Sequence, residues 1–256
     1  MRQQPTPSSR RSSMLAAGGA AISKAVAADD KTAPQAEMRV EVLAARITAI
    51  LAHFAIIAAL VLLGVRLFGD MQIGVAMATL YLLLPLTSYD VHKVTHVLPA
   101  ALILWGLVAY RRPLIAGGLM GFACGALFYP VFLLPLWTAF YGRRGAVRFL
   151  SALGVVAALL LGTLALTSSD LQSFKTQTFG SIDWRVVKLT EGDADGFWSK
   201  YDAAYGIPVF AAYIVMLIVL TVWPRKKNLE HLIAHSTAII IGTQFWYPVE
   251  GGVYVL

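Results

Sequence analysis

Charge, cysteine and catalytic signature motifs are all scarce in this sequence. Only 14% of its 256 residues are charged, whereas 58% are hydrophobic, and the mean hydropathy is +0.68. Soluble domains carry about 25% charged residues, so this chain cannot cover a water-facing surface. The single cysteine, Cys124, excludes an internal disulfide. No GxSxG, HExxH, Walker or Rossmann motif occurs in a usable context, and the composition predicts an integral membrane protein whose first partner is the lipid bilayer.

The net charge is +7, but the basic residues do not form the continuous patch of a nucleic-acid-binding protein. They occur in short clusters between apolar runs, as in the cytoplasmic loops of membrane proteins. The clusters are Arg111-Arg112, Arg143-Arg144-Arg148 and Arg225-Lys226-Lys227. We therefore expect no nucleic-acid partner, and we expect these three clusters on the cytoplasmic side.

Apolar runs alternate with short loops from residue 41 onwards, which predicts an all-α, polytopic bundle of transmembrane helices. The run 47–65 contains no Asp, Glu, Lys or Arg and is close to the roughly 20 residues that cross a bilayer. About eight spans are expected, at 47–65, 71–86, 89–110, 114–128, 131–141, 149–167, 207–223 and 231–247.

Charge also predicts the orientation of these spans. If the basic clusters are cytoplasmic, residues 114–141 form a hairpin that leaves and returns, and Gly117, Gly121 and Gly125 allow another helix to approach closely. The polar residues 87–96 and the loop 168–206 then lie outside. This loop carries six acidic residues against four Lys and Arg, and its aromatic residues suit either a headgroup belt or a cap over a cavity.

Residues 1–40 are polar and differ from the predicted transmembrane domain, 41–256. The sequence SRRSSMLAAGGA, in which Arg10-Arg11 precede a weakly apolar stretch, resembles a twin-arginine export signal. A disordered cytoplasmic tail is the alternative. The orientation favours export, because it places the residues before the first span outside.

One short polar island interrupts the apolar runs. It holds Asp90, His92, Lys93 and His96 in the sequence SYDVHKVTHVLP. Ionisable groups at membrane depth are costly and usually mark function, so we expect any chemistry near this island. A carboxylate beside a cavity can act as a general base, while Lys and His can hold a phosphate. A polar helix start at the interface is the alternative, and the histidine pair lacks the third ligand of a zinc site.

Three further histidines lie outside the island. His53 stands in mid-span and is expected to hydrogen-bond inside the bundle. His231 and His235 follow the last basic cluster and are expected to reach the headgroups from the cytoplasmic end of a span. We predict neither a bound metal nor a cofactor.

The stretch YLLLPLTSYDVHKVTHVLP, continuing to FLLPLW at 132–137, resembles the middle of the GT-C membrane glycosyltransferases, closest to the family 87 mannosyltransferase-like group. The similar parts are a polar island, a short Leu/Ala helix, a basic turn, a Gly-rich helix, a Pro-containing break and a Leu/Pro helix. The resemblance covers residues 75–150 well and 150–256 by general character. Two features depart from the family. Phe128 stands where a Lys is common, and the early external loop with the catalytic Asp has no counterpart.

The resemblance implies sugar transfer from a polyprenyl-phosphate donor on the external face of an integral membrane protein, in the inner (plasma) membrane of a bacterium. Asp90 would be the base, with Lys93 and Arg185 as phosphate partners. His92 or His96 would assist, and the cations of the protein would serve in place of a metal.

The same resemblance matches the C-terminal half of such enzymes. A separate polypeptide is therefore an expected partner, supplying the missing N-terminal spans. Two other functions stay open: a non-catalytic membrane remnant or assembly partner, and a transporter or lipid-binding protein.

Overall fold

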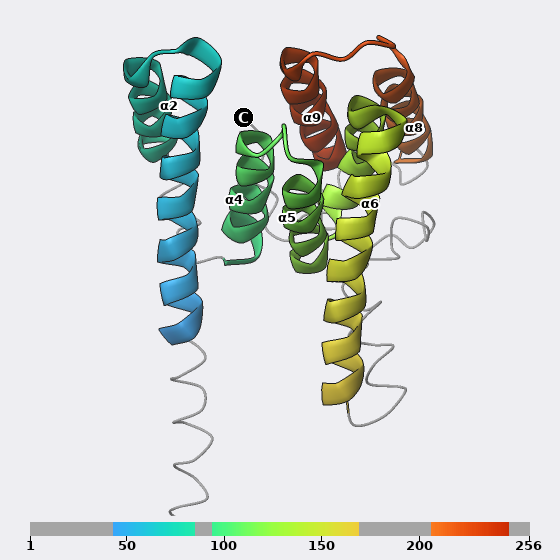
Figure 1. Cartoon of the computed structure of the whole chain (residues 1–256), viewed down its shortest axis with the longest axis horizontal. Coiled ribbons are helices and arrows are strands. Elements are labelled where there is room, and N and C mark those ends of the chain that lie inside the picture. The colour runs from blue at the N-terminus through green and yellow to red at the C-terminus, as the bar shows by residue number, and fades with distance from the viewer. Residues whose placement is uncertain (1–42, 85–93, 169–205, 246–256) are drawn as a thin grey trace, which may run out of the picture. The chain divides into compact units, whose positions relative to one another are not determined.

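The computed structural model describes residues 43–84, 94–168 and 206–245, and its helices are drawn in Figure 1. Every regular element in these ranges is helical, which confirms the all-α prediction. The chain divides into two compact units, Met1–Thr48 and Ala49–Leu256. In the first unit only residues 43–48 are described, and there the Thr48 hydroxyl donates to the Ala44 carbonyl at 2.8 Å. The boundary predicted at residue 40 and the predicted export signal lie outside the described residues.

The first helix spans Leu43–Phe68, and its last turn is π-helical. After a left-handed Gly69, the Asp70 carboxylate accepts a hydrogen bond from the Gln72 amide at 2.7 Å and starts the next helix. Pro113 starts another helix directly after the basic turn, at a position where a missing N–H costs nothing. The labelled elements are η1 (Gly64–Phe68), α2 (Met71–Leu83), α4 (Val94–Val108), α5 (Pro113–Ala126), η2 (Tyr129–Leu133), α6 (Leu134–Thr167), α8 (Gly206–Val222) and α9 (Leu229–Gln244).

Two helical stretches, Leu43–Phe68 and Tyr129–Thr167, are long and apolar enough to cross a membrane. The other apolar helices of the described ranges are shorter, so the bundle of eight spans stays a prediction. Large apolar side chains nevertheless cover the outside of the helices; Leu83 is 74% exposed and Leu166 is 88% exposed. Extensive exposed apolar surface is typical of a face that contacts lipid or another protein.

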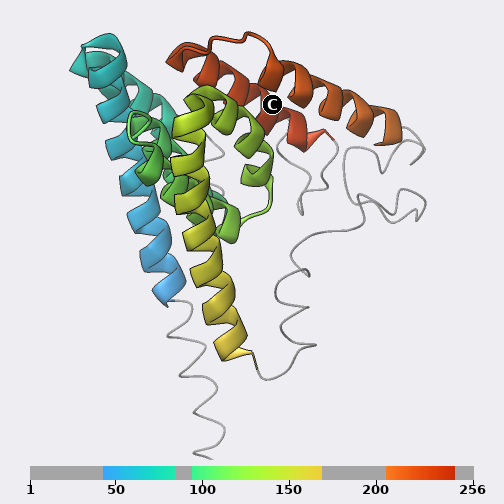
Figure 2. The same cartoon turned by 45° about the vertical axis from the view of Figure 1, so that its right-hand side comes forward.

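The chain reverses direction inside α6. Trp137 and Phe149 stack with ring centroids 6.1 Å apart, whereas twelve residues of straight helix would separate them by about 18 Å. The reversal occurs at Gly142, whose φ of 61° and ψ of 179° are almost confined to glycine. Figure 2 shows the two halves of α6. The sequence-based separation of spans at 131–141 and 149–167 agrees with this break, and the membrane-crossing candidate is the second half, 143–167.

The glycine row of α5 makes the closest helix contact, as expected. A Cβ on Gly117 would overlap the Phe149 carbonyl, and one on Gly121 would lie 3.0 Å from Val156. Further along, a Cβ on Gly125 would overlap Leu160. Residue numbers rise together on both sides, so α5 and the second half of α6 run parallel.

The parallel packing fixes which turns lie at the same end of these helices. α5 begins directly after the basic turn 111–112, and the second half of α6 begins with the basic residues of 143–148. The Arg66 guanidinium donates to the Val108 carbonyl at 2.6 Å, so η1 also ends near the first of these turns. This arrangement agrees with the orientation predicted from charge.

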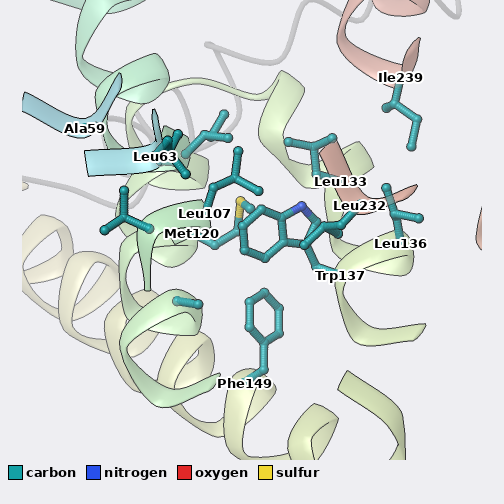
Figure 3. Packing of buried hydrophobic residues seen from close by; sticks show 14 of the residues in the cluster. Ala59, Leu63, Leu107, Met120, Leu133, Leu136, Trp137, Phe149, Leu232 and Ile239 are labelled. Carbon is teal, nitrogen blue, oxygen red and sulfur yellow. The ribbon is translucent and has the colours of Figure 1, made fainter. Parts of the chain in front are cut away.

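The core of the larger unit is centred on Trp137 (Figure 3). The indole is fully buried, and Nε1 donates to the Ser236 hydroxyl of α9 at 3.2 Å. On the opposite side, a Cβ on Gly106 of α4 would lie 3.2 Å from the ring. Trp137 therefore connects α4, α6 and α9 around one side chain.

Replacing Gly117 with valine should destabilise the bundle by about 1–3 kcal/mol or more, because the new side chain meets backbone that cannot move aside. Gly154→Val is the matched control: Gly154 lies in α6 with nothing within 4 Å of its Cβ position, and the change in helix propensity is the same. Thermal unfolding in detergent measures both. Equal losses in the two variants would contradict the contact.

Candidate functional site

Four of the five predicted site residues, Asp90, His92, Lys93 and Arg185, lie outside the described residues. The fifth, His96, belongs to the first turn of α4, where the backbone is described but the side chain is not. The proposed roles of these residues therefore stay predictions. The described residues do define the surroundings of the helix on which the polar island ends.

The start of α4 packs into a small apolar cluster. Val97 and Ala101 of α4 are buried against Ala52 and Ile56 of the first helix, and Tyr81 of α2 lies partly buried beside them. The first helix, α2 and α4 thus meet at the first turns of α4.

A polar pair lies within this apolar layer. Nδ1 of His53 and the hydroxyl of Tyr81 form a hydrogen bond of 2.8 Å, with the rings 6.0 Å apart. This confirms that His53 hydrogen-bonds inside the bundle. Its second nitrogen, Nε2, is buried and has no partner among the described residues. A buried nitrogen without a partner costs about 1–3 kcal/mol. A further hydrogen bond to Nε2 of His53 would therefore be stabilising.

A second cross-helix hydrogen bond lies close by along the first helix. Nε1 of Trp105 in α4 donates to the Ala55 carbonyl at 3.0 Å. Together with the His53–Tyr81 bond, it ties the first helix to both α2 and α4. Sequence reasoning missed Tyr81 and Trp105, because nothing in the local pattern links residues 28 or 50 positions apart.

The His53–Tyr81 pair lies near the end of α2 and the start of α4, the two helices that the polar island connects. Tyr81 stands two residues before α2 ends at Leu83, and Val97 stands in the first turn of α4. Because Tyr81 and Val97 belong to one cluster, residues 84 and 94 are anchored near His53. The chain therefore joins Asp90, His92 and Lys93 to the part of the bundle that holds His53.

Metal chemistry finds no support in the described ranges, where no group of three potential His, Cys, Asp or Glu ligands occurs. His231 and His235 of α9 lie with ring centroids 5.8 Å apart, yet they make only a pair. Both are half-buried, and the Nδ1 of each is buried with no partner among the described residues. The expectation that they reach the headgroups stays a prediction.

No family model matches the chain, and neither a curated protein nor a solved structure matches it. The similarity to GT-C glycosyltransferases therefore rests on the sequence pattern alone.

Tyr81→Phe should lower stability by about 0.6–1.7 kcal/mol, because it removes the hydroxyl that pairs with His53. Tyr141→Phe is the matched control: the Tyr141 hydroxyl is buried without a partner, so its loss should be neutral or stabilising. Thermal unfolding in one detergent compares them. If His53→Phe removes the effect of Tyr81→Phe, the two side chains are coupled; additive losses would show that they are not.

Proposed function

We propose that the chain is an integral membrane glycosyltransferase-like protein that transfers a sugar from a polyprenyl-phosphate donor on the external face of the membrane. The observation that carries the proposal is the His53–Tyr81 pair against the first turns of α4. An ionisable side chain within a membrane bundle is a functional hypothesis by default. Here it adjoins the helix on which the polar island ends.

The packing of α5 supports an external location for the site. Gly117 pairs with Phe149 and Gly125 with Leu160, so the end of α6 lies away from the basic turns. The start of α4 lies away from them too, because Val108 at its other end accepts from Arg66. The polar island and the loop that follows Ser168 thus attach at the same end of the helices.

The proposed chemistry needs one base and several cations. The acceptor hydroxyl attacks the anomeric carbon and passes its proton to Asp90, while the bond from that carbon to the phosphate oxygen breaks. The polyprenyl phosphate leaves with the electron pair of that bond, and Lys93 and Arg185 stabilise its charge. His92 and His96 assist by hydrogen bonding.

One described residue favours the alternative, a non-catalytic assembly partner. Phe128 occupies the position at which the resembling family commonly carries Lys, and its ring packs edge-to-face on Phe132 at 5.4 Å. An aromatic pair supplies no charge for a phosphate. A chain that cannot transfer sugar by itself would be consistent with the need for a second polypeptide.

The orientation is testable by labelling single cysteines in a Cys124→Ala background with a membrane-impermeant maleimide. Ser168→Cys should label from outside, whereas Arg112→Cys and Arg144→Cys should label only after the membrane is opened. The expectation follows from the parallel packing of α5 and α6, which places both basic turns at one end. Labelling of Arg112 and Arg144 from opposite sides would contradict it.

Activity is testable with membranes supplied with polyprenyl-phosphate mannose. Asp90→Asn should lower transfer by about 10²–10⁴-fold, as loss of a general base does, without changing membrane insertion. Asp70→Asn is the control, because Asp70 caps α2 and asparagine caps equally well. Lys93→Ala should weaken donor binding and leave a residual rate. Wild-type protein with no transfer, alone or with its upstream partner, would favour the assembly role.

A further inference from the structure

The turn between α8 and α9 carries a cluster of basic residues. Among them, only Lys227 hydrogen-bonds to other described residues. Lys227 is half-buried, and its Nζ donates to the Thr221 and Pro224 carbonyls at 2.7 and 3.0 Å. It thereby satisfies the end of α8, and desolvation lowers the pKa of this ammonium. Arg225 and Lys226 are exposed, and among the described residues neither has a partner.

Three polar atoms near this turn have no hydrogen-bond partner among the described residues. They are Oγ1 of Thr221, Nδ1 of His231 and Nδ1 of His235, all buried. His235 hydrogen-bonds to the backbone of Leu220 in α8 and interacts electrostatically with His231 and Lys227. The atoms therefore belong to one cluster at the junction of α8 and α9. Each can donate a hydrogen bond, the imidazoles in the appropriate tautomer or when protonated.

The basic side chains near the other turns have different partners or surroundings. Arg111 lies 5.5 Å over the Tyr110 ring, and its Nε donates to the Tyr110 hydroxyl at 2.9 Å. Arg66 is bound to the Val108 carbonyl. Arg143 and Arg144 are exposed, but no described histidine lies near them in the sequence. Only the α8–α9 turn, among those described, combines two free cations with several unpaired donors.

The chemistry of this turn is complementary to an anion at a membrane surface. Glu230, the acidic residue nearest in sequence, is itself exposed. Trp223 at the end of α8 is 73% exposed, and tryptophan favours the level of the lipid headgroups. Basic clusters between membrane helices on the cytoplasmic side attract anionic lipids.

We propose that the α8–α9 turn is a binding site for the phosphate of an anionic phospholipid. Arg225 and Lys226 contact the phosphate oxygens, the Thr221–His231–His235 donors lie behind them, and Trp223 holds the glycerol region. The site is independent of sugar transfer and lies on the membrane face opposite to that proposed for the donor.

Phosphatidylglycerol titrated into the full chain in neutral detergent, with bound lipid counted by native mass spectrometry, tests the proposal. Arg225→Gln with Lys226→Gln should weaken binding of the tightest lipid by about 30-fold, since each basic residue near an anionic headgroup contributes about fivefold in affinity. Arg143→Gln with Arg144→Gln removes the same charge from another exposed turn and should leave that lipid bound. Phosphatidylcholine should not compete.

Three outcomes would overturn the assignment. Equal weakening by both double variants would mean attraction by net charge and no defined site. Displacement of phosphatidylglycerol by millimolar inorganic phosphate would make the ligand a free phosphate. Absence of any retained phosphatidylglycerol in the wild type would remove the site altogether. Because the substituted side chains are exposed, unchanged helix content by circular dichroism verifies that the variants are folded.

Discussion

The contact of α5 with the second half of α6 at Gly117 is the constraint on which the described fold depends. Backbone meets backbone there, since the missing Cβ would overlap the Phe149 carbonyl. Two parallel helices cannot be joined by a short turn, so the chain must cross back between them. The crossing consists of η2 and the first half of α6, and Gly142 ends it with a conformation almost confined to glycine. Trp137, on the returning segment, then fills the space between α4, α6 and α9.

Hydrogen bonds between helices fix how the helices are aligned along their axes, which apolar packing alone does not determine. Lipid gives little preference for one apolar contact over another, so helix association relies on close packing and on hydrogen bonds across helices. The described bonds each join different elements: Trp105 to the first helix, His53 to Tyr81, and Trp137 to Ser236. A shift of one residue would break such a bond and leave a donor in apolar surroundings.

The sequence predicted what depends on composition and local spacing. It placed helices on the apolar runs, a break near the basic residues after Tyr141, a close approach along the glycine row, and a hydrogen bond for His53. It could not name Tyr81 as the partner, because that contact arises from packing across helices. It also could not show that Nδ1 of His231 and of His235 is buried, since their spacing alone does not reveal what packs around them. For the polar island the described residues give the anchoring points and not the side chains.

Helix length gives a physical reason to regard that island as unusual. α4 has 15 residues and rises about 22 Å, less than the roughly 30 Å of a hydrocarbon core. If the basic turn at 111–112 lies at the cytoplasmic interface, Val94, the first described residue of the helix, is still within hydrocarbon depth. In that orientation the chain joins the predicted polar island at a depth where charge is expensive. Such segments persist in membrane proteins where they line a protein-enclosed or water-filled cavity. The unpaired nitrogen of His53, beside the same helix start, is the described group best placed to border such a cavity.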